Sequence, residues 1–505
     1  MPGRTFVKFL IDTNILIPLE PTSLDDVSPA ITDAASFVQI VQAAGHHIVT
    51  HPDQLYDINR DKDKSRRELR QKLFKKYTCL PSSPSTSEDL TAELGDPPKH
   101  SNDWVDNQLL IALHIGAVAN IVTEDKDLQS KARRLGHQDK VLYLAEALNF
   151  AQTMFGKPDP PPKVESIPVY DLNQQDPIFN SLRADYKNFN EWLKICIDDD
   201  RDAWVIKGSN NRYAALCIIN EETKDNLKVS GKILKICTFK VSSEYSGYHY
   251  SELLLKTIFH IAMRKKYDWL YITVFPKYEP LIGILMDFGF QIQSRKSSRG
   301  EYVLLKPLRY SPEELEKLAP KDFLELYGPY TFKLKGITPF MVPIKPNFHR
   351  ILFPGSDPDL FPGIHPFGNC IRKVYICRAS IRRLNAGDVL FFYISKGGEI
   401  HGIYELGVVE DTMVSDDPES IAQFAGKRSI YSYNEIRELT QKRALAIKFW
   451  HSGTFSEPIA LNELIIADLH PPRSIQEIRQ EKRKWLYEEM KRRLPSWQFT
   501  QGLPI

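Results

Sequence analysis

Apolar runs of strand length alternate with helical stretches through the first part of the chain. VKFLI (residues 7–11) and HHIVT (46–50) are short apolar runs, whereas residues 30–43 carry apolar positions at helical spacing. An apolar helix within 101–115 and a short strand at 119–123 continue the alternation. Alternating strands and helices are typical of a parallel sheet covered by helices, so we expect an α/β domain over residues 1–155.

The middle of the chain changes pattern at a proline-dense segment. GKPDPPPKVESIP (156–168) has little to bury and is typical of a semi-rigid linker. Residues 169–309 then return to strands and helices, with a long amphipathic helix inside SSEYSGYHYSELLLKTIFHIAMRKK. Residues 310–342 combine a charged helix, SPEELEKLA, with proline and glycine, so we interpret them as a connector.

Short strands separated by turn signals dominate the last part. KVYICRA, DVLFFYIS, IHGIYELGVVE and RALAIKFW have the spacing of a compact β barrel, which we expect over residues 343–505 together with a basic helical tail. The pattern as a whole predicts a multidomain α/β chain with a parallel-sheet α/β domain, an α+β domain and a C-terminal barrel.

Composition narrows the class of protein without naming a partner. The 505 residues are 42% hydrophobic and 26% charged, and the net charge of +2 neither supports nor excludes nucleic acid. Six cysteines without a CxxC pair indicate reduced core residues rather than a zinc site or a disulfide framework. No apolar run has the length of a signal peptide or a membrane span, so we expect a cytoplasmic protein.

Acidic side chains recur at the ends of the first domain's elements. They are Asp12, with Asn14 beside it, after the first strand, Asp57 in HPDQLYDINRD, Asp106 in the apolar helix, and Asp125 after the strand 119–123. Because parallel strands end at one edge of a sheet, such acids can converge. Gathered carboxylates repel one another unless protons or a hard cation intervene, which favours Mg²⁺ or Mn²⁺. The alternative is that Asp12 and Asp125 only cap helices or turns.

The pieces LIDTN, DNQLLIAL and IVTEDKDL, in this order, resemble PIN-domain ribonucleases, including small bacterial toxin nucleases, over about residues 8–155. The resemblance implies that Asp12, Asp106 and Asp125 bind metal and that Asp57 serves a second metal or activates water. It gives Asn14 and Thr123 orienting hydrogen bonds, with Asp103 and Asp127 in reserve. Two departures are Asp57, where glutamate is commoner in the family, and a longer insertion at 80–100, which we expect to be a mobile loop.

The second domain resembles the GNAT acetyltransferase fold in GYHYSELLLKTIFHIA and LIGILMDFGF, over about residues 170–308. That resemblance implies acetyl-CoA as a cofactor, contacted by Val241, Gly247 and Ser251. The family's pyrophosphate loop and general acid are altered, however, at Ser246, His249 and Leu285. Active acetyl transfer and a retained non-catalytic scaffold therefore both stay open.

The last domain resembles the PUA-like superfamily, in its ASCH or EVE branches, through Gly387-Asp388, the run 402–409 and the strand with Trp450. These branches are associated with RNA or modified bases, and basic residues beside Tyr375 and the run 391–393 could serve that purpose, although strand alternation buries about half of such rings. The nucleic-acid contacts that we predict are Arg372, Lys373 and Arg378 here, and Arg66, Arg67 and Arg70 on the basic helix KSRRELRQKLFKK. A solvated helix face is the plainer interpretation of that helix.

The leading hypothesis is a metal-dependent RNA endonuclease, with RNA as partner, whose other domains select or modify the RNA. Such an architecture fits a bacterial toxin or defence effector acting on tRNA or another cellular RNA, with a cognate inhibitor protein and no membrane partner. The alternatives are an acetyl-CoA-dependent N-acetyltransferase and a non-catalytic RNA-binding regulator. The sequence leaves the oligomeric state open.

Overall fold

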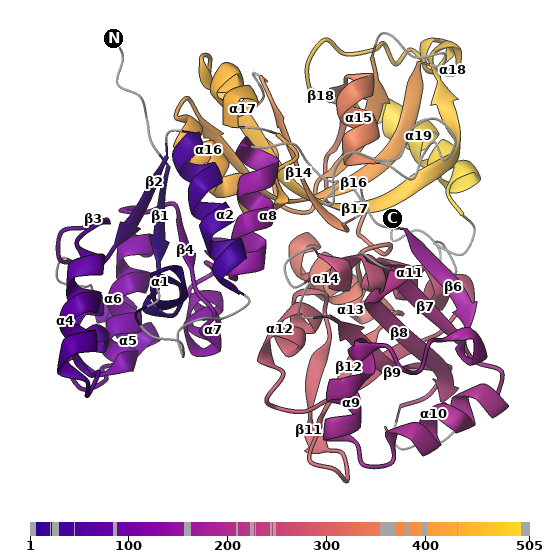
Figure 1. The fold of residues 1–505 in the computed structure, drawn as a ribbon. Coiled ribbons are helices and arrows are strands. Elements are labelled where there is room, and N and C mark those ends of the chain that lie inside the picture. The colour runs from indigo at the N-terminus through magenta and orange to yellow at the C-terminus, as the bar shows by residue number, and fades with distance from the viewer. Residues whose placement is uncertain are drawn as a thin grey trace. The chain divides into compact units, whose positions relative to one another are not determined.

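The computed structural model describes most of the chain and divides it into two compact units (Figure 1). The described residues are 7–20, 22, 30–44, 46–83, 88–155, 163–208, 211–222, 227, 229–242, 245, 249–353, 370–378, 381, 383–395, 401–431 and 433–495. Within them, the first unit holds the residues up to 155 together with Ser415–Lys442, and the second unit holds residues 163–414 and 443–495. The three-domain boundaries drawn from the sequence stay a prediction.

A five-stranded parallel sheet forms the centre of the first unit, in the order β3-β2-β1-β4-β5. Its strands are β1 (Lys8–Ile11), β2 (His47–Thr50), β3 (Thr78–Cys79), β4 (Asn120–Val122) and β5 (Val141–Leu142). The parallel sheet expected from the sequence is therefore present. Because β1 lies in the middle, with Ile11 opposite Val122 of β4, the residues that follow these two strands meet at one edge.

Helices cover both faces of this sheet. They are α1 (Thr13–Leu19), α2 (Ala30–Ala43), α3 (Gln54–Asn59), α4 (Lys64–Phe74), α5 (Glu88–Leu94), α6 (Asn102–His114), α7 (Lys126–Arg134) and α8 (Leu144–Phe155). The two-residue alternation of β1 divides the core: Phe9 makes edge contacts with Phe37 of α2 and Phe150 of α8, whereas Leu10 belongs to the cluster formed with α6 and α7.

The insertion at 80–100 contains ordered structure, which differs from the mobile loop that we expected. Helix α5 lies within it, and Leu90 and Leu94 are buried in the same cluster as Leu10. Residues 84–87 lie outside the described part. Burial of two leucines explains the order, since apolar side chains on one helix face stabilise the helix when they pack.

A segment from late in the chain completes the first unit. Helices α16 (Pro418–Ala425) and α17 (Tyr433–Thr440), with the short η7 (Gly426–Arg428) between them, belong to this unit although they connect two strands of the second. The Gln423 side-chain amide donates to the carbonyl oxygens of Val118 and Ala119 at 3.2 and 3.4 Å, just before β4. No pattern in the sequence predicts that α16 and α17 belong to the first unit.

The second unit contains a seven-stranded mixed sheet in the order β11-β12-β10-β9-β8-β7-β6. Its strands are β6 (Val164–Pro168), β7 (Asp202–Lys207), β8 (Tyr213–Glu222), β9 (Ile233–Val241), β10 (Trp269–Val274), β11 (Gln291–Lys296) and β12 (Tyr302–Pro307). Its helices are η2 (Val169–Asp171), η3 (Pro177–Phe179), α9 (Asn180–Asp185), α10 (Phe189–Asp198), α11 (Tyr250–Arg264) and α12 (Glu279–Asp287). Strand β6 overlaps the end of the predicted linker. It is an edge strand, and edge strands tolerate a proline such as Pro168. Residues 156–162 are not described.

Strands β9 and β10 are parallel and pair over only part of their length. Their register runs from Ile233 opposite Trp269 to Ile236 opposite Ile272, while β9 continues to Val241 along β8. The carboxyl-terminal half of β9 therefore has a partner strand on one side only among the described residues.

A second sheet in this unit has the order β14-β17-β16-β15-β13-β18. Its strands are β13 (Pro339–Ile344), β14 (Arg372–Cys377), β15 (Val389–Ile394), β16 (Gly402–Ser415), β17 (Ala444–Ala460) and β18 (Gln476–Glu477). The helices α13 (Pro312–Lys317), α14 (Pro320–Tyr327), α15 (Pro346–Leu352), α18 (Leu461–Ile466) and α19 (Gln480–Arg493) accompany it. β13 begins inside the predicted connector. The described strands leave β14 and β18 as edges, so the closed barrel that we expected is not shown.

Two sequence expectations about the chain as a whole can be compared with the structure. None of the six cysteines, all of which the structure describes, is in a disulfide, and Cys196, Cys217 and Cys370 are buried as expected of core residues. Cys237 and Cys377 are only partly buried and Cys79 is exposed, so the expectation of a core position is wrong for Cys79. Among the described residues, no helix is both long and apolar enough to cross a membrane.

The late segment of the first unit gives a test of the unit boundaries. Ile421 of α16 is fully buried, so Ile421→Ala should lower the stability of the first unit by about 2–4 kcal/mol. Hydrogen exchange followed by mass spectrometry should show faster exchange in α6 and β4. The matched control is Ile466→Ala, because Ile466 is 84% exposed and its loss should change little. Loss of protection confined to the second unit would contradict the assignment of α16.

Candidate metal centre

Asp12 is the central residue of the predicted site. It directly follows β1 and is the N-cap of α1, and its carboxylate accepts hydrogen bonds from the Thr13 backbone N–H at 2.6 Å and the Thr123 hydroxyl at 2.7 Å. Only 5% of Asp12 is exposed, so a carboxylate stands at the buried end of the sheet's middle strand. Such a group needs compensation by hydrogen bonds, a proton or a cation.

Asn14 and Thr123 hold Asp12 in place from two sides. The Asn14 side-chain amide donates to Asp12 Oδ2 at 2.7 Å and to Thr123 Oγ1 at 3.0 Å. Thr123 follows β4 and is fully buried, and its hydroxyl also accepts from the Asp125 backbone N–H at 2.9 Å. These contacts fix the orientation of one Asp12 oxygen, which is the part that the sequence hypothesis gave to Asn14 and Thr123.

The other three acids come from three different helices or helix starts. Asp125 is the N-cap of α7 and accepts from the backbone N–H groups of Asp127 and Leu128 at 2.7 and 3.0 Å. Asp106 lies in the second turn of α6, and Asp57 lies in α3, where it pairs with Arg60 at 2.5 Å. Capping, the alternative for Asp12 and Asp125, is thus real at both positions, but it does not account for Asp57 and Asp106.

Asp12 and Asp106 each interact electrostatically with the other acids of the predicted site. Burial, followed by repulsion from Asp12, raises the pKa of Asp106 to about 7, while Lys131 opposes the rise and Asp125 and Asp57 add to it. Burial also raises the pKa of Asp12 to about 6, against the hydrogen bonds from Thr123 and Thr13. At Asp57, burial raises the pKa and Arg60 lowers it.

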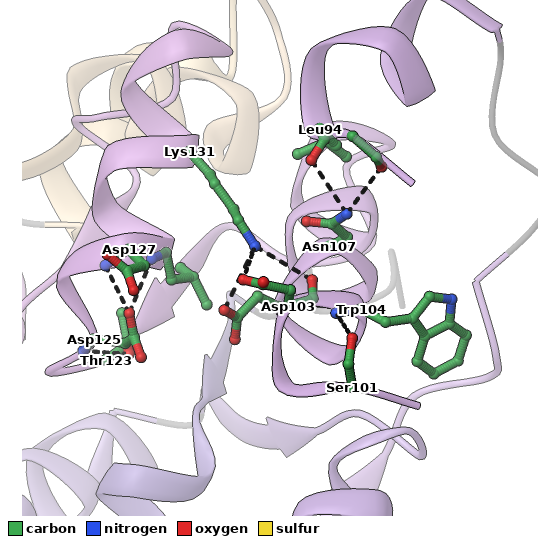
Figure 2. A network of polar contacts seen from close by, with 12 residues as sticks. Leu94, Ser101, Asp103, Trp104, Asn107, Thr123, Asp125, Asp127 and Lys131 are labelled. Atoms are coloured by element: carbon green, nitrogen blue, oxygen red, sulfur yellow. Dashed lines mark hydrogen bonds and ion pairs between the residues drawn. The ribbon is translucent and has the colours of Figure 1, made fainter. Parts of the chain in front are cut away.

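Lys131 is a cation at this site that the sequence reasoning missed. Figure 2 shows it reaching from α7 toward α6, where its ammonium lies 3.0 Å from an Asp103 carboxylate oxygen and 3.7 Å from one of Asp106. The Lys131 side chain is 10% exposed and that of Asp103 is 64% exposed. Asp103 therefore pairs with Lys131 at the rim rather than joining the buried acids, and Asp127 is exposed in the first turn of α7.

The donor set fits a hard divalent cation. Asp12, Asp57, Asp106 and Asp125 supply only carboxylate oxygens, which are the ligands that Mg²⁺ and Mn²⁺ prefer. Burial is the main cause of the raised pKa values of Asp12 and Asp106, and repulsion from the neighbouring acids adds to it. A metal ion would remove that repulsion.

The arginines that we predicted to bind nucleic acid on the basic helix have an internal partner instead. Arg66 contacts both Asp61 carboxylate oxygens, at 2.5 and 2.7 Å, and Arg70 contacts one at 2.7 Å. Arg67 donates to the Asp61 backbone carbonyl at 2.7 Å, and the hydrogen bonds from Arg66 hold the pKa of Asp61 well below its ordinary value. Asp61 thus pairs with the arginines that we had predicted to bind the phosphates of a nucleic acid.

The basic residues of the last domain are also placed differently from our prediction. Arg372 is buried and forms an ion pair with Glu410, and Lys373 is 2% exposed, where burial lowers its pKa to about 7. Only Arg378 of the three is exposed. The neighbouring rings, Tyr375 and those at 391–393, are buried, so none is available for stacking.

The start of α11 is where the GNAT resemblance places a pyrophosphate. Of the predicted cofactor contacts, Val241 ends β9 and Ser251 lies in the first turn of α11, whereas Gly247, with Ser246, lies outside the described residues. Glu252, also in the first turn, is 3% exposed and accepts from the Arg372 backbone N–H at 2.8 Å.

Two described residues at this helix start, Glu252 and His249, do not favour a pyrophosphate. A buried carboxylate at Glu252 would repel the pyrophosphate that the helix N-terminus should attract. His249, the N-cap residue, has a left-handed φ of 57° and a side chain 8% exposed, in a position where the family has glycine. Both residues fill space and charge that the cofactor would need.

A second group of metal-ligand types surrounds Glu252. Single ligand atoms of His249, Glu252 and Cys370 lie within 4.8 Å of one another, all buried. Lys256 and Lys373 interact electrostatically with both Glu252 and Cys370. Two lysines so close compete with a bound cation, so we interpret this group as a buried polar network that joins α11 to β14.

The coupled acids predict how stability depends on pH. Since the folded-state pKa values of Asp12 and Asp106 lie near 6 and 7, above ordinary aspartate values, the metal-free fold retains protons that the unfolded chain has released. Stability in EDTA should therefore fall as the pH rises from about 4 to about 7, and added Mn²⁺ should restore it most above that range. Thermal unfolding with and without Mn²⁺ measures both effects.

Asp106→Asn should remove most of this dependence and stabilise the metal-free protein at pH 8 by about 1–3 kcal/mol, because it removes one of the repelling charges. Asp103→Asn is the matched control, since Asp103 is on the same helix but exposed. Equal pH profiles for the wild type and Asp106→Asn would show that the acids do not repel one another.

Comparisons with known proteins found similar solved structures that each cover only part of this chain. No family model matches the chain, and no curated protein matches it. Among solved structures, ASCH from Zymomonas mobilis is similar at 16% identity, covering 30% of this chain and 94% of its own, with a TM-score of 0.24. A GNAT family acetyltransferase from Elizabethkingia anophelis with acetyl-CoA bound is similar at 15% identity, covering 29% and 98%, with a TM-score of 0.20.

The NatC complex bound to Gag peptide and CoA is similar at 14% identity, covering 29% of this chain and 99% of that one, with a TM-score of 0.22. The printed names of these neighbours are those of an ASCH protein and of acetyltransferases, and the TM-scores are all below 0.25. The PIN resemblance receives no support from the comparisons.

Proposed function

We propose that the first unit binds Mg²⁺ or Mn²⁺ and hydrolyses phosphodiester bonds of RNA, as the PIN-like motifs imply. The proposal is supported by the Asp12 carboxylate at the end of the sheet's middle strand, which interacts electrostatically with Asp57, Asp106 and Asp125. Burial is the main cause that raises the pKa values of Asp12 and Asp106, and the neighbouring acids add to it. A purely structural cluster of this kind would destabilise the fold, whereas a cation site uses the same charge.

The side chains divide the work of such a site. Asp12, Asp106 and Asp125 would hold the cation, and Asn14 and Thr123 keep Asp12 oriented through hydrogen bonds of 2.7 Å each. A bound cation supplies charge that lowers the pKa of water and offsets the charge on the scissile phosphate. Asp57 faces this site with Thr13 at 3.5 Å, in a position to take a proton from water.

Lys131 would supply the positive charge nearest the acids. It lies within 3.7 Å of Asp106 and is anchored by Asp103, so it can approach a phosphate oxygen that enters between α6 and α7. A toxin or defence effector could use this activity to cleave tRNA or another cellular RNA. A cognate inhibitor protein would then block the activity. In the second unit, exposed Arg378 is the remaining predicted RNA contact.

The acid site predicts the outcome of a cleavage assay. Asp12→Asn and Asp106→Asn should each reduce Mn²⁺- or Mg²⁺-dependent cleavage of total RNA by at least about 100-fold, because each removes a metal ligand. The matched control is Asp127→Asn, an exposed acid two residues beyond Asp125, which should cleave like the wild type. Thermal unfolding should show that all three variants fold. Identical RNA profiles for the wild type and Asp106→Asn would exclude this function.

Acetyl transfer is the second candidate, and one observation favours it. The carboxyl-terminal half of β9 diverges from β10, which leaves backbone groups from Cys237 to Val241 for an extended ligand. The obstacle is the helix start described above, where Glu252 and His249 stand against a pyrophosphate. The non-catalytic scaffold is therefore the interpretation that we carry forward for this part.

A calorimetric titration tests the scaffold interpretation. Acetyl-CoA added to the full-length protein should give no binding heat, because a buried acid in the first turn of α11, Glu252, would oppose a pyrophosphate there. A GNAT enzyme titrated under the same conditions serves as the positive control. Saturable binding to this chain would contradict the scaffold and restore acetyl transfer as the leading function of the second unit.

A further inference from the structure

Three aromatic rings form a stack in the first unit that the metal centre does not use. The rings of Tyr56 and His100 are stacked, with centroids 3.8 Å apart and an angle of 25°. Trp104 meets His100 edge-on at 5.0 Å and Tyr56 at 5.9 Å. We call these three residues the aromatic ledge.

One contact links the ledge to the acid cluster, through Arg60. Tyr56 precedes Asp57 on α3, and Trp104 lies two residues before Asp106 on α6, where Figure 2 shows its indole pointing away from Lys131. Arg60 joins the two features, because its guanidinium donates to the Asp57 carboxylate and to the His100 backbone carbonyl. Arg60 thus connects the backbone of one ledge residue, His100, to Asp57 of the predicted metal site.

The ledge is open to solvent at one end. Tyr56 is 37% exposed, which is unusual for so large a ring, and His100 and Trp104 are half-buried. His100 also has a left-handed φ of 67°, a conformation that costs energy for a residue other than glycine. The backbone at His100 thus adopts an unfavourable conformation that positions the imidazole ring, and the neighbouring Tyr56 ring stays accessible to solvent.

Charge around the ledge matches a polyanion. Arg60 is 40% exposed in its side chain and Lys99, next to His100, is exposed. Arg60 is itself paired with Asp57, just as Arg66 and Arg70 of α4 are paired with Asp61. Exposed rings interleaved with cations are the combination used to bind single-stranded nucleic acid.

We propose that the aromatic ledge stacks an unpaired base of a single-stranded RNA whose next phosphate lies at the metal centre. In a duplex both faces of every base are covered by neighbouring bases, so only an unpaired base can offer a free face to Tyr56. Arg60 and Lys99 then meet the adjoining phosphates. The inference rests on the proposed nuclease function and specifies its substrate as single-stranded rather than duplex RNA.

A binding experiment with the full-length protein tests the ledge separately from cleavage. Asp12→Asn serves as the background that does not cleave, and fluorescence anisotropy follows a labelled uridine-rich single strand and the same strand in a duplex. Adding Tyr56→Ser should weaken single-strand binding about tenfold, the loss expected for one base stack, and leave duplex binding unchanged. Tyr56→Phe keeps the ring and should bind like the background. Tyr170→Ser, at a site 55% exposed in the second unit, is the control for an unrelated tyrosine.

The outcomes separate the ledge from the nuclease. Unchanged single-strand binding by Tyr56→Ser, or equal losses for single strand and duplex, would overturn the ledge, as would equal losses in Tyr56→Phe. Calorimetry should show that the wild type and the single variant Tyr56→Ser bind Mn²⁺ equally well. If single-strand binding depends on the Tyr56 ring but the wild type neither binds Mn²⁺ nor cleaves RNA, the ledge proposal is supported and the nuclease proposal is wrong.

Discussion

The burial of Asp12 and the partial burial of three neighbouring carboxylates form the constraint on which the predicted site depends. The parallel sheet brings Asp12 and Thr123 to one edge, and helices that follow or cross that edge add Asp57, Asp106 and Asp125. Hydrogen bonds from neighbouring hydroxyl, amide and backbone groups satisfy individual oxygens but do not cancel the shared charge. The fold therefore places a deficit of positive charge at one point, and a divalent cation is the simplest species that removes it.

Positive charge close to this point is limited and already partly committed. The Lys131 ammonium contacts the carboxylates of Asp103 and Asp106. The Arg60 guanidinium contacts the Asp57 carboxylate and the His100 backbone carbonyl. Both cations lie at the rim, where they can approach a phosphate without occupying the place between the acids. This arrangement separates the cation that the acids would hold from the side chains that would steer a polyanion.

The second unit uses buried charge in a different way. Glu252, Lys256, Lys373 and Cys370 form a mixed network between α11 and β14, in which acids and lysines lie close together. Burial lowers the pKa of both lysines, so the network is costly to rearrange, and removal of one member would leave another buried and unbalanced. A helix start committed to such a network is not free for a phosphate, which is why the fold of the second unit by itself does not establish its activity.

The sequence by itself determined the parallel sheet of the first unit and the acids at its edge, because strand and helix periods and strand-end polar residues are local signals. It also indicated altered residues around His249. It overestimated the free cations, since Asp61 engages Arg66 and Arg70 through contacts that a count of charges does not contain.

Only the tertiary structure decided the rest. The partnership of Ser415–Lys442 with the first unit, the position of Lys131, the stack of Tyr56 on His100 and the burial of Glu252 all join residues far apart in the chain or on different elements. Each depends on how surfaces pack, and packing is set by the whole core rather than by a local pattern, so no reading of neighbouring residues could supply it.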